Sequence, residues 1–189
     1  MRLPKLVREL PLFGPLYGKR ATLSVYENPQ TGQQYDFPIF RVDKPPVNIV
    51  FPVTAKLEVV VIKQYRHAAD RIIYELPGGL ADGGESEQDA IRRELLEETG
   101  YRAARVVPLL AEPIYFEPAS LDFRFKLFLA LECVAQEDQK LDANEYISIE
   151  VMPLVAWVNH ITRGEYITDA KSMAATLLAW TQLRGAYDL

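Results

Sequence analysis

The stretch from Gly78 to Tyr101, GGLADGGESEQDAIRRELLEETGY, constrains this chain of 189 residues more than any other. Ser86 is a favourable N-cap residue, and Gly100 can adopt the left-handed conformation that ends many helices. We therefore predict a helix over Glu87–Thr99, preceded by a loop in which four of seven residues are glycine. Glycines permit tight turns, so this loop can bring its backbone close to the helix.

The predicted helix carries an unusual cluster of carboxylates. At about 100° per residue, four of them fall within one arc, next to an apolar stripe that includes Ile91. The four are Glu87, Glu94, Glu97 and Glu98. Like charges three or four residues apart repel each other, so such a cluster favours a bound cation. Ligands that are all oxygen suit hard divalent ions such as Mg²⁺ or Mn²⁺.

The spacing of these residues resembles a known signature. Gly79 is followed after five residues by Glu85, and after seven more by RELLEETGY, which begins at Arg93. This pattern is similar to the Nudix box of hydrolases that cleave nucleoside diphosphates linked to another group. Tyr101 departs from it, since an aliphatic residue is more usual there. The resemblance implies an α/β fold, the Nudix α/β/α sandwich with a mixed sheet, here with an N-terminal β-hairpin extension.

The resemblance also implies a set of metal ligands. Glu94 and Glu98, one helical turn apart, would be the principal ligands of Mg²⁺ or Mn²⁺, with Glu97 beside them. The backbone carbonyl of Gly78 would supply a further oxygen. Metal ions would neutralise diphosphate oxygens and help to form hydroxide, so Glu97 and Glu98 count among the catalytic residues.

Two further side chains are expected to take part in catalysis. Arg93 can pair with Glu85 and Glu97 and so hold the glycine loop against the helix, which would orient the ligands. In the resembling family, a glutamate on a loop after the box activates the attacking water, and Glu145 matches that position best. Glu150 is the competing candidate, and a solvated loop acid is the alternative reading of Glu145.

The residues immediately before the box resemble the ADP-ribose pyrophosphatase branch of this family. They read QYR up to Arg66 and ELPGG from Glu75. Arg66 is a candidate clamp for a substrate diphosphate, because a guanidinium binds phosphate oxygens bidentately. A surface salt bridge is the alternative role for Arg66. Glu75 is a second candidate for the substrate site, where it would either bind metal or brace the loop.

A further part of the substrate site is expected after the box. Pro118 and Asp122 match positions that contact substrate in the same branch. Ala119 stands where glycine is common and Asp122 where glutamate is common, so the contacts to the ribose differ from the usual pattern. Tyr115 and Phe116 either stack on a base or fill the sheet, and we expect the second.

The N-terminal part predicts a separate element. Met1–Gly18 reads as an irregular, proline-containing segment. Ala21–Tyr26 and Tyr35–Val42 predict two strands around a turn. We assign residues 1–44 to this lead and hairpin and residues 45–189 to a Nudix hydrolase domain. The hairpin resembles the strands with which ADP-ribose pyrophosphatases embrace a second subunit, which implies a homodimer; a local sheet extension in a monomer is the alternative.

The rest of the chain alternates strands and helices irregularly. Two runs rich in valine and isoleucine predict central strands, Asn48–Thr54 and Leu57–Tyr65. Long strands are expected over Ala104–Tyr115 and Phe123–Val134. Helices are expected over Pro153–Arg163 and Asp169–Leu183, the second of them facing the core with Met173, Leu177, Leu178 and Trp180.

Composition excludes several classes of function. The net charge is −5, so there is no basic surface of the kind that binds nucleic acid. No run approaches the roughly 20 apolar residues of a membrane span, and the N-terminus does not read as a signal peptide. We therefore expect a cytoplasmic protein with no membrane or nucleic-acid partner.

The single cysteine, Cys133, lies in an apolar run and predicts a core thiol.

The resemblance predicts a Mg²⁺-dependent enzyme that splits ADP-ribose into AMP and ribose 5-phosphate. Within enzymes the alternative is another nucleoside diphosphate sugar, such as GDP-mannose. From a different class, the alternative is a nucleotide sensor that uses the same fold without hydrolysis. The complete set of box acids argues against a sensor, because clustered carboxylates cost stability unless a metal ion binds them.

Overall fold

The computed structural model describes residues 2–16, 19–42, 46–142 and 145–187. It divides into two compact units. The first contains Met1–Pro46 and Ile114–Arg124, and the second contains Val47–Pro113 and Phe125–Leu189. The predicted boundary after residue 44 falls close to the end of the first segment. The contribution of Ile114–Arg124 to the first unit was not predicted.

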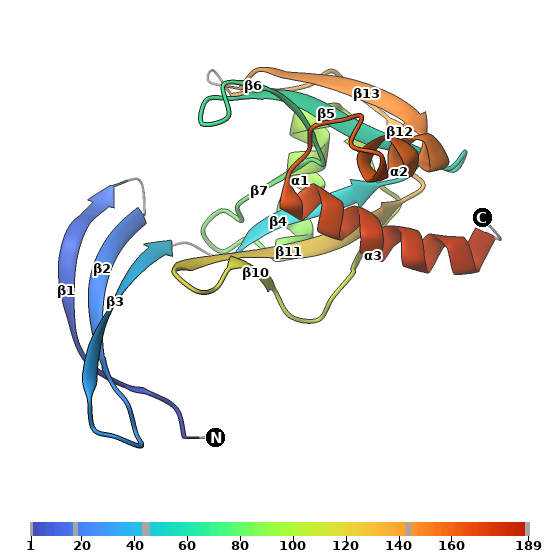
Figure 1. Cartoon of the computed structure of the whole chain (residues 1–189). Coiled ribbons are helices and arrows are strands. Elements are labelled where there is room, and N and C mark those ends of the chain that lie inside the picture. The colour runs from blue at the N-terminus through green and yellow to red at the C-terminus, as the bar shows by residue number, and fades with distance from the viewer. Residues whose placement is uncertain (1, 17–18, 43–45, 143–144, 188–189) are drawn as a thin grey trace. The chain divides into compact units, whose positions relative to one another are not determined.

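The first unit is built on three antiparallel strands, which Figure 1 shows side by side. They are β1 (Lys5–Leu16), β2 (Lys19–Glu27) and β3 (Gln34–Val42). The predicted hairpin is confirmed as β2 and β3, with a turn in which the Gly32 N–H donates to the carbonyl of Asn28. A fourth strand, β10 (Ile114–Glu117), pairs with the beginning of β11 (Leu121–Leu131). In turn, Leu121 of β11 lies opposite Phe40 of β3 in parallel pairing.

The prediction of an irregular N-terminal segment is wrong, because Lys5–Leu16 forms the strand β1. Its register against β2 shifts at several points, including between Pro11 and Phe13. β1 lies at the end of the strand order, where a proline can be accommodated because one side of the strand need not donate hydrogen bonds. The prolines therefore produced an irregular edge strand, not a loop.

The second unit is an α/β/α sandwich with mixed strand pairing, as predicted. In one sheet, β4 (Val47–Pro52) pairs parallel with β11 and antiparallel with β7 (Gly78–Gly79), and β9 (Arg105–Pro108) pairs antiparallel with β11. In another, β5 (Glu58–Arg66) lies between β6 (Arg71–Glu75) and β13 (Ile147–Pro153). A short pair joins β8 (Tyr101–Arg102) and β12 (Val134–Ala135).

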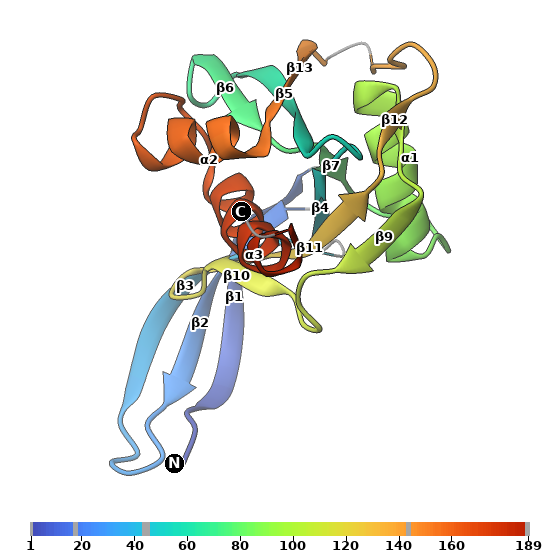
Figure 2. The same ribbon diagram turned by 90° about the vertical axis from the view of Figure 1, so that its right-hand side faces the viewer.

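In the described part of the chain, three helices cover these sheets. They are α1 (Glu87–Thr99), α2 (Leu154–Thr162) and α3 (Ala170–Tyr187). Figure 2 shows α1 on one side of β4, with α2 and α3 on the other. Among the described residues, no helix is long and apolar enough to cross a membrane.

The predicted central strands form the core. Val50 and Phe51 of β4 and Val60 of β5 are fully buried. Ile91 and Leu95 of α1 are also fully buried and join a cluster that includes Val50. Cys133 is buried in the same cluster, which confirms it as a core residue, and this burial raises the pKa of its thiol to about 12.

Two predicted strands after the box have different limits. Ala104–Tyr115 is not one strand, because β9 ends at Pro108 and β10 begins at Ile114. The run Phe123–Val134 starts earlier, at Leu121, and is interrupted at Glu132, whose φ of 55° is incompatible with an extended strand. A pattern of apolar residues cannot locate such interruptions.

The predicted core face of α3 is wrong for two of its four residues. Met173 and Leu177 are 47% and 66% exposed, whereas Leu178 and Trp180 are half-buried. The fully buried positions include small residues, such as Ala175 and Ala179. α3 packs on β4, and small side chains let a helix lie close to a strand.

Candidate functional site

The glycine loop and α1, together with Lys140, Asp142 and Glu145, line a cavity of about 520 Å³ in the second unit. The residues that line it are Gly78, Gly79, Leu80, Asp82, Arg93, Glu94, Glu97, Glu98, Lys140, Asp142 and Glu145. The cavity therefore brings together the box acids, Arg93 and the predicted general base.

Local sequence sets the limits of α1 and so the position of its acids. The Oγ of Ser86 accepts a hydrogen bond from the Asp89 N–H at 3.1 Å, and Gly100 ends the helix with a φ of 72°. The helix runs over the predicted residues. Gly79 allows the loop to approach closely, because a Cβ there would lie 2.2 Å from a carboxylate oxygen of Glu94. Any side chain at this position would displace Glu94.

Glu98 is a buried acid at the inner end of the cavity. Its side chain accepts a hydrogen bond from the Gly78 N–H at 2.8 Å, and the residue is only 5% exposed. Burial raises the pKa of Glu98 to about 8, and the neighbouring charges of Glu94 and Glu145 act in the same direction. Burial also raises the pKa of Glu94. A cation bound between these acids would relieve the unfavourable burial of their charges.

Arg93 makes the predicted pairs with Glu85 and Glu97. Its Nε and Nη2 donate to the two carboxylate oxygens of Glu85, both at 3.1 Å, and its Nη1 donates to Glu97 at 3.0 Å. Nη1 also reaches Glu94 at 3.0 Å, and Nη2 reaches the carbonyl of Leu80 at 3.0 Å. Arg93 therefore holds the glycine loop to the helix and balances part of the acidic charge.

The acids fit a metal ion that takes few protein ligands. Among the described residues, no three histidine, cysteine or acidic side chains are arranged to hold one ion. Glu94 and Glu97 both accept from Arg93, whereas within the described part of the chain Glu98 accepts only from the backbone of Gly78. Mg²⁺ usually binds through one or two carboxylates and completes its shell with water and phosphate. Glu94 and Glu98 would suit that arrangement; the ligand roles of Glu94, Glu97, Glu98 and the Gly78 carbonyl stay predictions.

The two candidates for the general base differ in position. Glu145 lines the cavity and is close enough to influence the pKa of Glu94 and of Glu98. Glu150 lies on β13 and pairs with Lys63 at 3.2 Å. The geometry therefore favours Glu145, although residues 143 and 144 next to it lie outside the described part of the chain.

Sequence reasoning missed the residues that attach this segment to α1. The Lys140 N–H donates to the Glu97 carbonyl at 2.8 Å, and the side-chain amide of Gln139 donates to the Glu98 carbonyl. Lys140 also lines the cavity, and its ammonium pairs with Glu137 at 2.8 Å. The one sequence signal was a basic residue within a polar segment, which by itself does not indicate a site.

Arg66 and Glu75 form a bidentate ion pair. The guanidinium Nε and Nη2 of Arg66 lie 2.5 Å and 2.6 Å from the two carboxylate oxygens of Glu75. Glu75 is 1% exposed, and Lys171 contacts the same carboxylate at 2.9 Å. Burial alone would raise the pKa of Glu75, but the bonds from Arg66 and the charge of Lys171 hold it below its usual range. This geometry favours the bracing alternative for Glu75.

Pro118 and Asp122 belong to the first unit, where both line a cavity of about 260 Å³. The Asp122 carboxylate lies 3.4 Å from the guanidinium of Arg124. Tyr115 and Phe116, which we expected in the core, are each 52% exposed within this structure. The predicted substrate contacts of Pro118 and Asp122 stay predictions.

Comparison with known proteins decides the family. A family model described as NUDIX domain matches residues 43–169, which is more than half of the chain. The chain belongs to the Nudix hydrolase family. It is 32% identical over 138 residues to an ADP-ribose pyrophosphatase of Bacillus subtilis, and the match covers 72% of each protein. It is 33% identical over 141 residues to a GDP-mannose pyrophosphatase of Cronobacter sakazakii, covering 70% of this chain and 71% of the relative.

A solved structure confirms the fold. A crystal structure described as an ADP compounds hydrolase superposes on this Nudix chain with a TM-score of 0.84, covering all of this chain and 98% of the other, at 17% identity. Taken with the sequence relatives, this places the chain in the ADP-ribose pyrophosphatase-like branch, as the sequence predicted. Nudix hydrolases generally use divalent metal ions, which agrees with the acids of α1.

The burial of Glu98 predicts how the stability of the metal-free enzyme depends on pH. The pKa of Glu98 is higher in the folded protein than the ordinary value of 4.5, so the folded state binds more protons between about pH 4.5 and 8. The free energy of unfolding should therefore fall as pH rises through this range, by on the order of 1–2 kcal/mol.

Urea denaturation in EDTA at pH 5, 6, 7 and 8 measures this effect, with Glu98→Gln as the control. The wild-type protein should lose more stability than the variant over this range, because glutamine does not titrate. Parallel pH dependences in the two proteins would show that Glu98 ionises normally.

Proposed function

We propose that this enzyme hydrolyses nucleoside diphosphate sugars, with ADP-ribose as its main substrate, in a reaction that requires Mg²⁺. The observation that carries the proposal is the pair formed by the half-buried Glu94 and the buried Glu98 at the glycine loop, where Arg93 bonds Glu94 and the Gly78 N–H bonds Glu98. The ADP-ribose pyrophosphatase of Bacillus subtilis supports ADP-ribose as the substrate.

The cavity suits the chemistry of a diphosphate. Hydrolysis adds a water oxygen to one phosphorus atom and breaks its bond to the bridging oxygen, giving AMP and ribose 5-phosphate. Bound Mg²⁺ would neutralise phosphate oxygens and lower the pKa of the attacking water. Glu145 lines the cavity, which supports it as the group that would accept a proton from that water.

Arg66 is the proposed clamp for the diphosphate. Its Nε and one N–H of Nη2 are occupied by Glu75, but the side chain is 43% exposed and keeps further N–H groups for a ligand. The charge of Arg66 acts on the buried Glu98, so the two groups share one electrostatic environment. Arg66 can be both an ion-pair partner of Glu75 and the diphosphate clamp, since the pair with Glu75 orients the guanidinium.

Two alternatives give different results in one experiment. The similarity to a GDP-mannose pyrophosphatase supports another nucleoside diphosphate sugar as the substrate. A nucleotide sensor would bind the ligand without cleaving it.

The experiment measures kcat/KM for ADP-ribose, GDP-mannose, UDP-glucose and a nucleoside triphosphate, each with and without Mg²⁺. We expect ADP-ribose to be cleaved with the highest kcat/KM, and the activity to disappear in EDTA. A higher kcat/KM for GDP-mannose would move the substrate assignment to that sugar. Calorimetric binding of ADP-ribose without any product would support a sensor.

Glu145→Gln tests the general base. Because proton transfer contributes at the transition state, the change should lower kcat by roughly 10²- to 10⁴-fold while KM and Mg²⁺ affinity stay close to wild type. Steady-state kinetics of Glu145→Gln and of Glu150→Gln give the answer. Full activity of the first variant with loss in the second would transfer the role to Glu150.

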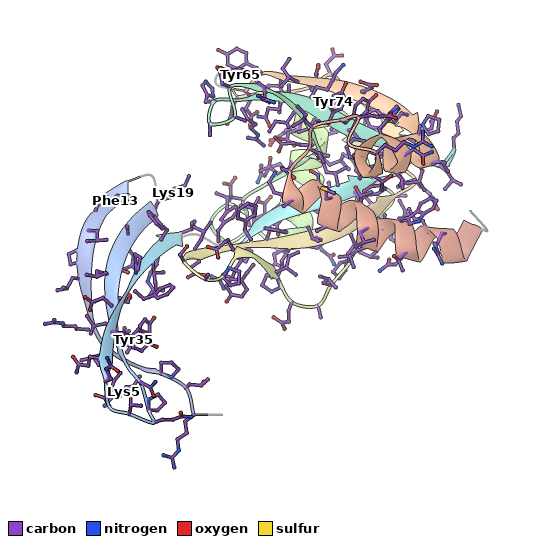
Figure 3. The ribbon with its side chains drawn as sticks, viewed as in Figure 1. Lys5, Phe13, Lys19, Tyr35, Tyr65 and Tyr74 are labelled. Carbon is purple, nitrogen blue, oxygen red and sulfur yellow. The ribbon has the colours of Figure 1, made fainter. Side chains whose placement is uncertain are left out.

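We also propose that the enzyme is a homodimer formed through the strands of the first unit. Within this unit, large apolar side chains of β1 and β3 are unusually exposed. They are Leu6, Val7, Leu10, Leu12, Phe13, Tyr35, Phe37 and Phe40, at 37–57% exposure. Figure 3 shows how far they extend along the sheet, with Phe13 near one end of the strands and Tyr35 toward the other. An apolar surface of this extent supports an association with a second copy.

Leu12→Glu combined with Phe37→Glu tests the dimer. Burying two carboxylates in an apolar interface is costly, so the variant should be monomeric in size-exclusion chromatography with light scattering. Gln33→Glu, at an exposed turn of the same unit, is the matched control and should leave the assembly unchanged. A monomeric wild-type protein, or a double variant with the same mass as wild type, would exclude this interface.

A further inference from the structure

The first turn of α3 contacts the Arg66–Glu75 pair through Lys171. Lys171 donates to the carboxylate of Glu75 at 2.9 Å and also pairs with Asp169. Asp169 precedes the helix and accepts a hydrogen bond from the Ser172 N–H at 2.7 Å, which caps the helix start. The four charged groups Arg66, Glu75, Asp169 and Lys171 form one network, in which Glu75 is the most buried member and Arg66 the most exposed.

The same turn is bonded to the segment that leads into the glycine loop. The Oγ of Ser172, which is fully buried, accepts from the Leu76 N–H at 2.9 Å. The Tyr74 N–H donates to the Ile167 carbonyl at 2.8 Å. The residues on both sides of Glu75 are thus fixed to the segment that contains Lys171, so the position of the Glu75 carboxylate depends on that segment.

The charges in this network balance only when Lys171 is present. Arg66 and Lys171 contribute two positive charges, and Glu75 and Asp169 two negative ones. Without Lys171, one guanidinium would have to neutralise two buried or half-buried carboxylates beside a cavity that is already acidic. An uncompensated charge in a buried site is costly, and its field would also repel an anionic ligand.

We propose that Lys171 is a positioning residue of the substrate site. By sharing the charge of Glu75, it fixes the carboxylate that orients Arg66 and leaves the positive charge of Arg66 available to the substrate diphosphate. The inference rests on the proposed function of Arg66 as the diphosphate clamp. Lys171 itself acts through Glu75 and does not contact the reacting atoms.

The kinetic test compares Lys171→Met and Lys171→Arg with wild type, using the substrate that the panel identifies. Lys171→Met should raise KM roughly tenfold, because Arg66 would then have to neutralise Glu75 and Asp169 alone and would attract the diphosphate less, while kcat changes by less than about threefold. Lys171→Arg should restore KM to within about twofold of wild type. Lys126→Met is the matched control, since Lys126 is a half-buried lysine with one ion pair, to Glu87 at 2.6 Å, and should leave KM unchanged.

Coupling to Glu75 distinguishes positioning from a general loss of structure. Once Glu75→Gln has removed the charge that Lys171 balances, the further change Lys171→Met should raise KM by no more than about twofold. Thermal unfolding of each variant shows whether it is folded. A folded Lys171→Met with wild-type KM, or effects on KM that multiply independently in the double variant, would overturn the proposal.

A failure of the Lys171 proposal can be distinguished from a failure of the proposed hydrolysis. If no substrate is cleaved, the proposed hydrolysis fails, and the same comparisons are made with the calorimetric Kd for ADP-ribose in the presence of Mg²⁺. A weaker Kd in Lys171→Met that Lys171→Arg restores would still support the positioning role. An unchanged Kd would refute it.

Discussion

The burial of the Glu98 carboxylate beside Glu94 is the constraint on which the rest of this site depends. Two acids in one partly enclosed cavity repel each other and lose hydration, so the surrounding structure has to compensate. Part of the compensation comes from the Gly78 N–H and from Arg93. The remainder is what a divalent cation would supply. The loop needs glycine at residue 79 because the Glu94 carboxylate occupies the space of a side chain there.

A second set of charges, centred on Glu75, lies at the segment that leads into the glycine loop. Glu75 is almost fully buried, yet both of its oxygens are bonded to cations, Arg66 from β5 and Lys171 from α3. Since Leu76 is also bonded to Ser172, the start of α3 fixes the chain just before the glycine loop. The C-terminal helix, far from the box in sequence, thus helps to position the chain that leads into the glycine loop.

The sequence predicted those parts of the molecule in which local signals agree. The limits of α1 followed from Ser86 and Gly100, and the pairs of Arg93 followed from the spacing of the box. The central strands followed from their valine and isoleucine content. For α1 and Arg93, the relevant interactions lie within about twenty residues of one another, so a pattern along the chain contains the information.

Other features depend on contacts that no local pattern contains. The core face of α3 was predicted from large apolar residues, whereas the close packing on β4 selected Ala175 and Ala179. The strand β1 contains prolines that a central strand would exclude, and only its place at the edge explains them. Lys171 meets Glu75 across 96 positions of sequence, so its role could be found only in three dimensions.

The central claim is that Glu94 and Glu98 hold the divalent ion, and a Mn²⁺ titration followed by electron paramagnetic resonance tests it most directly. Wild-type protein should bind Mn²⁺, and Glu98→Gln should weaken that binding at least roughly tenfold. Glu112→Gln, at an exposed acid outside the cavity, should bind as wild type does. Equal Mn²⁺ affinity in the wild type and in a folded Glu98→Gln protein would contradict the claim.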